Sequence, residues 1–408
     1  MARIVILGCG FSGLYAAFEI LKNLRESDQL IIISNDDKFV LTPLLHEIST
    51  NSISPSDISV PIHSLLKSYK NYKFVKDKVN SINFNAKVIE TGRQNISYDY
   101  LLISLGSVPN RTVLPNGIKQ KNIYVIKTLD DAIKILSGLQ NILSLYLEKT
   151  QKNYVNILIV GAGATGIEMA GEICSFFKLH SKKYNKKKTN IVNIYLLQIF
   201  DGIFPDKAKS FREKIKKRLQ ASGINVLYNT KLISYKNSRA VIKTKDKKRE
   251  LYAQMVLLTA GVIPTPLITT PKKNMSNGAF EVNDFLEVKN TEKVWAAGDI
   301  AYFINPSDRR PVPMLAQTAK DQGKFIGKNI IAKIKGKPQK AYEFHSKGFI
   351  ISIGKGYGIG DIYGVLMSGW FIWWLKRTVY AIEFPSVRNK IKMLWKLSIR
   401  SLFRNYKS

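Results

Sequence analysis

The chain has 408 residues, of which 45% are hydrophobic and 11% aromatic, and it carries 63 lysines and arginines against 30 aspartates and glutamates. This apolar content excludes a disordered or collagen-like chain, and two cysteines are too few for a disulfide framework or a structural zinc site. The formal charge of +33 favours an anionic partner, either a nucleic acid or a membrane surface. At this length we expect two or three domains.

The first predicted element is a buried strand within residues 1–7, which leads into a glycine-rich turn and then a helix. A secretory signal is not expected, because the apolar run passes straight into the turn. Such a turn binds pyrophosphate through backbone N–H groups and the helix dipole, and its glycines let the phosphate come close. The residues predicted to hold the phosphates are Gly8, Gly10, Phe11, Ser12 and Gly13.

A second strand, residues 30–33, ends where a ribose-binding acid is expected, about 20 residues beyond the turn. Ser34 stands at that position and Asn35 follows it, with Asp36 and Asp37 just beyond. A hydroxyl group can also hydrogen-bond a ribose. We therefore expect Ser34 and Asn35 to belong to the nucleotide site.

The same order of elements recurs further along the chain, with a strand at residues 156–160, a turn and a helix. Its second strand, residues 194–197, ends at Gln198 and is delayed by a basic insertion at 178–188. Two glycine turns in strand–turn–helix order predict two nucleotide sites. The second set of phosphate-binding residues is Gly161, Gly163, Ala164, Thr165 and Gly166.

Short apolar strands that end on glycine follow these units. One closes at Gly106 and another at Gly261, and a third begins at Val294 and ends in Gly298-Asp299. Each is expected to return the chain to a parallel sheet. The sequence therefore predicts an α/β fold with two Rossmann-like dinucleotide-binding domains, one nested in the other.

In this order the motifs resemble those of the FAD-dependent pyridine nucleotide-disulphide oxidoreductases, a superfamily with two dinucleotide domains. The resemblance implies that FAD binds at the first turn, with its ribityl chain hydrogen-bonded to Asp299, and that a nicotinamide dinucleotide binds at the second turn. Such a pair of cofactors implies hydride transfer to the flavin. The disulphide reductases of this superfamily use a redox cysteine pair, whereas Cys9 and Cys174 lie far apart and are interpreted as packing residues.

Within the superfamily, four segments resemble type II NADH dehydrogenase: residues 41–47, 163–172, 313–323 and 348–354. The resemblance implies a non-proton-pumping NADH:quinone oxidoreductase of a respiratory chain, a homodimer bound peripherally to the cytoplasmic face of the cell membrane. A nucleic-acid partner is not expected, because no recognition module accompanies the lysines. The alternative is an NAD(P)H reductase that serves a soluble acceptor or an acidic carrier protein.

The type II resemblance also assigns roles to single residues. Thr42 and Pro43 are expected beside the flavin, and Ala316 and Gln317 are expected at the same cofactor. Glu172 is expected to approach the place where nicotinamide and flavin meet, and the alternative is an exposed helix acid. His46 is not assigned a catalytic role.

Besides Ser34, which replaces the expected ribose-binding acid of the FAD site, two positions depart from the family pattern. Gln198 replaces the acid that accepts the 2′-hydroxyl of NADH, so discrimination against NADPH should weaken. Asp321 replaces the second of two glutamines in the quinone motif, four residues after Gln317 on one helix face. Asp321 either supplies a proton to the quinone or turns to solvent.

The C-terminal region is apolar and basic. Residues 364–375 form an aromatic run well short of the ~20 residues that span a bilayer, and Lys376 and Arg377 follow at once. Residues 364–408 hold nine basic residues and one acidic one, which favours an amphipathic helix on anionic lipid. Packing on the body of the protein or on a second subunit is the alternative. The recurring basic residues are Arg388, Lys392, Lys396, Arg400 and Arg404, and the expected apolar side is Val387, Ile391, Leu394, Trp395 and Leu402.

We therefore predict three regions. The FAD-binding domain comprises residues 1–115 and 265–335, and the NAD(P)H-binding domain comprises residues 116–264. The C-terminal region, residues 336–408, is expected to associate with the membrane and to frame the entrance for the quinone. A metal ion is not expected.

Overall fold

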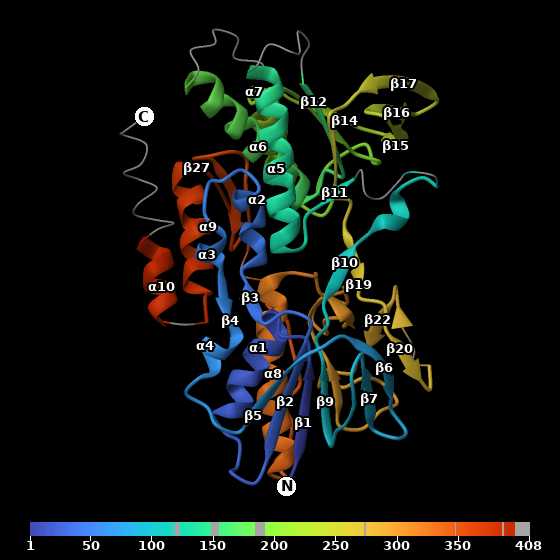
Figure 1. Ribbon diagram of the computed structural model, residues 1–408, viewed down its shortest axis with the longest axis vertical. Helices are drawn as coiled ribbons and strands as arrows, with labels where there is room; N and C mark the ends of the chain where they lie inside the picture. Colours follow the sequence, from blue (N-terminus) through green and yellow to red (C-terminus); the bar gives the residue numbers. More distant parts are fainter. Residues whose placement is uncertain are drawn as a thin grey trace. The chain divides into compact units, whose positions relative to one another are not determined.

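The structure, a computed structural model, describes residues 1–116, 118, 123–147, 155–183, 192–272, 275–346, 348–385 and 387–395 (Figure 1). The side chains of residues 146–147, 181–183 and 387–389 are outside this description. Contacts divide the chain into two compact units. The first comprises Met1–Val40, Ser59–Val108 and Val262–His345, and the second comprises Leu41–Ile58, Pro109–Gly261 and Ser346–Ser408.

The first unit is built on a five-stranded parallel sheet in the order β23-β9-β1-β2-β5. Its central strands are buried on both faces, which explains why they are apolar without alternation. The register sets Leu7 beside Ile33 and Ile103, so the carboxyl ends of three strands meet at one edge. The strands are β1 (Arg3–Leu7), β2 (Gln29–Ser34), β5 (Tyr72–Lys76), β9 (Tyr100–Ile103) and β23 (Val294–Ala296).

Helices α1 (Phe11–Leu21) and α8 (Ala316–Ile334) pack against each other in this unit (Figure 1). A Cβ atom on Gly323 would overlap the backbone of Ser12, so only glycine allows the two helices to approach this closely. Helix α8 therefore lies directly beside the first glycine turn.

Smaller sheets complete the first unit. Strand order is β20-β6-β7-β8 in one sheet, β21-β22-β24 in another and β3-β4 in a third, and β10 pairs with β19 where the chain passes between the units. The elements are β3 (Lys38–Val40), β4 (Ser59–Pro61), α4 (Ile62–Leu66), β6 (Val79–Asn83), β7 (Val88–Thr91), β8 (Asn95–Ser97), β10 (Ser107–Pro109), β19 (Val262–Pro264), β20 (Ile268–Thr270), β21 (Met275–Ser276), β22 (Ala279–Glu281), η4 (Gly298–Ile300) and β24 (Ala301–Tyr302).

The second unit repeats the architecture with a parallel sheet in the order β11-β18-β12-β13-β14. Its core contains the apolar faces of three helices, α5 (Leu129–Leu147), α6 (Ala164–Lys183) and α7 (Lys209–Ala221). An antiparallel sheet of three strands, β15, β16 and β17, packs in a second hydrophobic cluster with the alternate side chains of the parallel strands. The strands are β11 (Tyr124–Val125), β12 (Val155–Val160), β13 (Val192–Leu197), β14 (Ile224–Leu227), β15 (Thr230–Lys236), β16 (Arg239–Thr244), β17 (Lys247–Tyr252) and β18 (Met255–Leu258).

Two distant parts of the chain also belong to the second unit. One is residues 41–58, and the other is the C-terminal sheet β25-β26-β27 with α9 (Trp370–Ile382) and α10 (Val387–Met393). A Cβ atom on Gly171 of α6 would overlap the backbone of Gly354, so the C-terminal sheet packs tightly on this helix. The remaining elements are η1 (Thr42–Leu44), α2 (Leu45–Ile48), α3 (Pro55–Ile58), η2 (Arg111–Val113), β25 (Phe349–Ser352), β26 (Gly358–Ile362) and β27 (Val365–Gly369).

The prediction of an α/β fold with two parallel, Rossmann-like sheets is confirmed, including the returning strands β9, β18 and β23. The aromatic run at residues 364–375 forms β27 and the start of α9. The predicted insertion at 178–188 lies partly in α6, and its residues 184–188 are outside the described part of the chain. So are Lys396, Arg400, Leu402 and Arg404, and the side chains of Val387 and Arg388.

Within the described ranges, no helix combines the length and the apolar character that crossing a bilayer requires.

Candidate functional site

The turn between β1 and α1 has the geometry of a phosphate cradle. Gly8 has φ of +86°, and a Cβ atom there would overlap the carbonyl oxygen of Ser104. A Cβ atom on Gly13 would overlap the carbonyl oxygen of Gly8, whereas one on Gly10 would meet no atom within 4 Å. The backbone of the turn is therefore tightly packed at Gly8 and Gly13, whereas the space beside Gly10 is open.

The first turn of α1 leaves its backbone donors available. Its N-cap residue, Gly10, provides no side-chain hydrogen bond, and residues 11–14 include no acid. Unpaired N–H groups and the positive end of the helix dipole together attract an anion. The residues at this turn therefore fit the pyrophosphate of a dinucleotide.

The Gly298-Asp299 pair lies in η4, directly after β23 of the same sheet. Gly298 has φ of +73°, and its N–H donates to Gln322 Oε1 at 2.7 Å. Asp299 accepts a hydrogen bond from the Ser107 hydroxyl. Ser107 begins β10 and directly follows Gly106, which the sequence also predicted for this site. Gln322 is buried on α8 and was not found from the sequence, because a glutamine five residues beyond Gln317 matches no motif.

Other predicted residues of the first unit lie on separate elements. Ser34 ends β2, Asn35 follows it, and Ala316 and Gln317 begin α8. Asp321 is exposed, and it accepts a hydrogen bond from Tyr342 Oη at 3.2 Å. Burial, followed by the Asp321 charge, raises the pKa of that tyrosine. Thr42 and Pro43 belong to the second unit.

The second glycine turn, between β12 and α6, copies the first. Gly161 has φ of +110°, a Cβ atom on Gly166 would overlap the Gly161 carbonyl oxygen, and one on Gly163 would meet nothing within 4 Å. Gly261, after β18, has φ of +87°. The second turn, which includes Ala164 and Thr165, therefore fits a second pyrophosphate by the same criteria.

Gln198 lies at the end of β13, as predicted. Its side-chain Nε2 donates to the carbonyl oxygen of Gly202 at 2.8 Å, which braces the loop that follows the strand. The side chain is thus held at the end of the strand and carries no charge.

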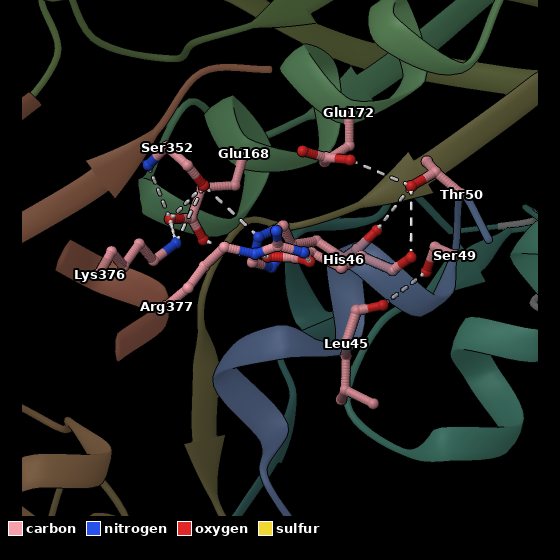
Figure 2. Close-up of polar contacts among 10 residues, drawn as sticks. Leu45, His46, Ser49, Thr50, Glu168, Glu172, Ser352, Lys376 and Arg377 are labelled. Atoms are coloured by element: carbon pink, nitrogen blue, oxygen red, sulfur yellow. Dashed lines mark hydrogen bonds and ion pairs between the residues drawn. The ribbon is translucent and has the colours of Figure 1, made fainter. Parts of the chain in front are cut away.

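The second unit also contains a buried polar cluster that the sequence did not reveal (Figure 2). It brings together side chains from α2 and the residues after it, from α6, from β25 and from α9. Figure 2 shows His46 beside Glu168 of α6, and its Nδ1 lies 3.7 Å from Glu168 Oε2. The members of this buried polar cluster are His46, Glu47, Ser49, Thr50, Ser52, Glu168, Glu172, Ser352, Lys376 and Arg377.

Glu172 is buried, so the alternative of an exposed helix acid is wrong. The hydroxyls of Thr50 and Ser52 both donate to its Oε2, at 3.1 and 3.2 Å. Burial and the nearby charge of Glu47 raise the pKa of Glu172 to about 7. This carboxyl group can therefore exchange a proton near neutral pH, as a general acid or base must.

Glu47 and Arg377 form a buried, two-point ion pair. Arg377 Nε donates to Oε1 at 3.1 Å and Nη2 donates to Oε2, and the guanidinium lies 4.5 Å from the centroid of the Trp373 ring. Burial opposes ionisation of Glu47, but the Arg377 charge outweighs it and lowers the pKa of Glu47. The pair is therefore ionised in the folded protein.

Lys376 pairs with Glu168 and also donates to Ser352 Oγ at 3.0 Å. His46 Nε2 lies 3.5 Å from the same hydroxyl oxygen. Burial, followed by the Lys376 charge, lowers the pKa of His46 to about 3. His46 is therefore a neutral ring at physiological pH.

Lys376 and Arg377 do not serve as basic residues at a lipid surface, as the sequence suggested, because both are buried. Both residues are only 4% exposed, because each neutralises a buried carboxylate. The sequence did contain a signal that charged groups are buried here, namely the pair Glu168 and Glu172. These acids lie four residues apart among apolar residues on one helix and therefore share its buried face. A helix that buries two acids requires cations from elsewhere in the fold.

Two nested units with an open glycine turn each define a protein that binds two dinucleotides. The model of the family described as pyridine nucleotide-disulphide oxidoreductase matches residues 2–323, and the chain belongs to this family. The prediction of an oxidoreductase of this superfamily is therefore confirmed.

Particular relatives support the finer resemblance. A type II NADH:quinone oxidoreductase of Staphylococcus saprophyticus is 26% identical over 370 residues, which cover 90% of this chain and 91% of the relative. Among solved structures, NDH2 of Plasmodium falciparum in complex with NADH has a TM-score of 0.87 at 18% identity and covers 98% of both chains. The sulfide:quinone oxidoreductase of Aquifex aeolicus has a TM-score of 0.76 at 18% identity and covers 98% of this chain and 92% of that one. The predicted resemblance to type II NADH dehydrogenases is confirmed, and the two structures show a shared fold.

Proposed function

We propose that the chain is an FAD-dependent NADH:quinone oxidoreductase that does not pump protons. The observation that carries this proposal is the pair of open glycine turns with matching geometry, at Gly8–Gly13 and Gly161–Gly166, because two dinucleotide sites are what hydride transfer between a nicotinamide and a flavin requires. The staphylococcal relatives, which carry the name of this activity, support it.

FAD, when bound, supplies the acceptor of hydride from the nicotinamide and the donor of electrons to the acceptor substrate. The first turn would hold its pyrophosphate, and Asp299 its ribityl chain. The second turn would orient NADH. Glu172 would hold or release a proton, since its Oε2 is fixed by Thr50 and Ser52 and its pKa lies near neutral pH. Gln317 and Asp321 would face the quinone.

The acceptor and the nucleotide preference are tested together by steady-state oxidation of NADH and NADPH with a short-chain quinone. We expect a yellow protein that reduces the quinone with NADH. Because Gln198 presents no negative charge to a 2′-phosphate, we expect kcat/KM with NADPH to lie within about one order of magnitude of that with NADH. Gln198→Glu should raise KM for NADPH and leave KM for NADH nearly unchanged. Purified protein without flavin, or flavoprotein that fails to reduce the quinone, would contradict the proposed function.

The proposal includes peripheral attachment to the cytoplasmic face of a membrane through the C-terminal elements, in a homodimer. Its support is the set of apolar side chains that β27, α9 and the residues after them leave exposed, because exposed apolar side chains gathered on packed elements are typical of an interaction site. These residues are Val365, Met367, Trp370, Phe371, Val379, Ile382, Ile391 and Trp395.

Membrane binding should depend on Trp370 and Phe371, which are 43% and 50% exposed at the start of α9. We expect the double variant Trp370→Glu/Phe371→Glu to lose sedimentation with anionic lipid vesicles and to keep NADH oxidation with a soluble dye. Phe200→Glu, at an aromatic residue of the same unit that is 66% exposed, is the control and should sediment as before. Equal vesicle binding by all three proteins would rule out this attachment, and a change of oligomeric state would favour a subunit contact.

A further inference from the structure

The two dinucleotide turns share a feature behind the glycines. Ser104 follows β9, and its hydroxyl lies 2.8 Å from the carbonyl oxygen of Leu7 and 3.0 Å from that of Gly8. Thr259 follows β18, and its hydroxyl lies 3.1 Å from the carbonyl oxygen of Val160 and 2.8 Å from that of Gly161. Each hydroxyl thus bridges the last strand residue and the first turn glycine.

The match extends to the surrounding atoms. The N–H of Ser104 donates to Leu7 and that of Thr259 to Val160, both at 2.8 Å. A Cβ atom on Gly13 would lie 2.7 Å from Ser104 Oγ, and one on Gly166 would lie 2.7 Å from Thr259 Oγ1. Each glycine carbonyl is therefore enclosed between a hydroxyl group and the start of the helix.

The direction of this carbonyl matters for an anionic ligand. Gly8 and Gly161 both have positive φ. Glycine has no side chain, so its backbone could also adopt other conformations at little steric cost. A rotation of the peptide bond after either glycine would turn its carbonyl oxygen toward the phosphates and an N–H away from them. Such a rotation would replace an attractive dipole by a repulsive one.

We propose that Ser104 and Thr259 are positioning residues, each of which holds the carbonyl of its turn away from the pyrophosphate so that the turn's N–H groups face it. The assignment of FAD to the Ser104 side and NADH to the Thr259 side rests on the proposed function. The two residues act on separate ligands, so each is the internal control for the other.

The test uses the full-length flavoprotein with two substitutions that remove a hydroxyl, Ser104→Ala and Thr259→Val, the second of which keeps the side-chain shape. For Ser104→Ala we expect FAD to be released about tenfold faster on dilution, measured by flavin fluorescence, and KM for NADH to stay unchanged in excess FAD. For Thr259→Val we expect KM for NADH and the calorimetric Kd for NAD⁺ to rise about tenfold while kcat stays within about twofold, with FAD release unchanged.

Conservative variants separate positioning from a general loss of stability. Ser104→Thr and Thr259→Ser keep the hydroxyl, and each gives its turn the residue that the other turn uses. Both variants should therefore show the FAD release, KM for NADH and Kd for NAD⁺ of the native protein. The proposal is overturned if both hydroxyl-free variants change the same quantities, if neither changes any, or if the conservative variants do not rescue. If Ser104→Ala does not fold, the Thr259→Val and Thr259→Ser pair decides alone.

These outcomes are distinct from failure of the proposed function. Flavin release and NAD⁺ binding are measured without a quinone, so a flavoprotein that binds NAD⁺ but reduces no quinone would disprove the proposed activity and still test both hydroxyl groups.

Discussion

Arg377→Met is expected to destabilise the protein by about 3–5 kcal/mol, because it leaves the buried carboxylate of Glu47 without the cation that donates to both of its oxygens. Arg377 is 4% exposed and Glu47 is 4% exposed, so water cannot replace the lost partner. The free energy of unfolding measured in urea, at a pH where Glu47 is ionised, reports this loss.

The double variant Glu47→Met/Arg377→Met is the control for lost packing. Two methionines have volumes similar to the ion pair and need no hydrogen bonds, so we expect most of the stability to return. If the double variant were as unstable as Arg377→Met, the cost would come from lost packing on Trp373 and not from an unpaired charge.

Glu172 and His46 are expected to give opposite pH dependences of stability that largely cancel in the native protein. The pKa of Glu172 is raised from 4.5 to about 7, so its stabilising contribution is complete below pH 4.5 and is lost as the pH rises toward 7. The pKa of His46 is lowered from 6.5 to about 3, so its contribution is complete above pH 6.5 and is lost as the pH falls toward 3. Between pH 4.5 and 6.5 the two slopes oppose each other.

Single substitutions should expose each slope. Over these two pH units one uncompensated group corresponds to about 3 kcal/mol. We expect Glu172→Gln to lose about that much stability as the pH falls from 6.5 to 4.5, relative to the native protein. His46→Asn should instead lose about as much as the pH rises over the same interval.

Urea unfolding at several pH values between 4.5 and 6.5 measures both slopes. Glu250→Gln, at an exposed acid of the same unit, is the matched control and should follow the native protein. Parallel pH profiles for the native protein, Glu172→Gln and His46→Asn would show that neither buried group titrates as described.

The two glycine turns could be predicted because their requirements are local. A strand, a turn with glycines at fixed spacing and a helix follow one another within about 20 residues, and positive φ at Gly8 and Gly161 can be met by glycine at little cost. The returning strands could be predicted for the same reason, since β9 and β18 are short apolar segments, each followed three residues later by a glycine, Gly106 or Gly261. Trp370 and Phe371, which are exposed, belong to the apolar run at residues 364–375 that the sequence singled out.

The burial of Glu168 and Glu172 had a local signal, but their partners in the buried polar cluster could not be predicted, because the pairing depends on contacts between distant residues. Glu47 and Arg377 are 330 positions apart, and Glu168 and Lys376 are 208 apart. A lysine and an arginine after an apolar segment are typical of a solvated helix flank, and only the acids supplied by α2 and α6 make their burial favourable. The pKa of Glu172 near 7 likewise arises from burial and from the charge of Glu47 on another element.

By itself the sequence determined that this protein is built from two nested α/β units with two dinucleotide turns, since hydrophobic pattern and glycine spacing act within short segments. The tertiary structure decided which charged residues are buried, which acid titrates near neutral pH, and that Ser104 and Thr259 enclose the two turn carbonyls. Those properties depend on desolvation and on hydrogen-bond distances across the fold, and neither exists until the distant segments have packed together.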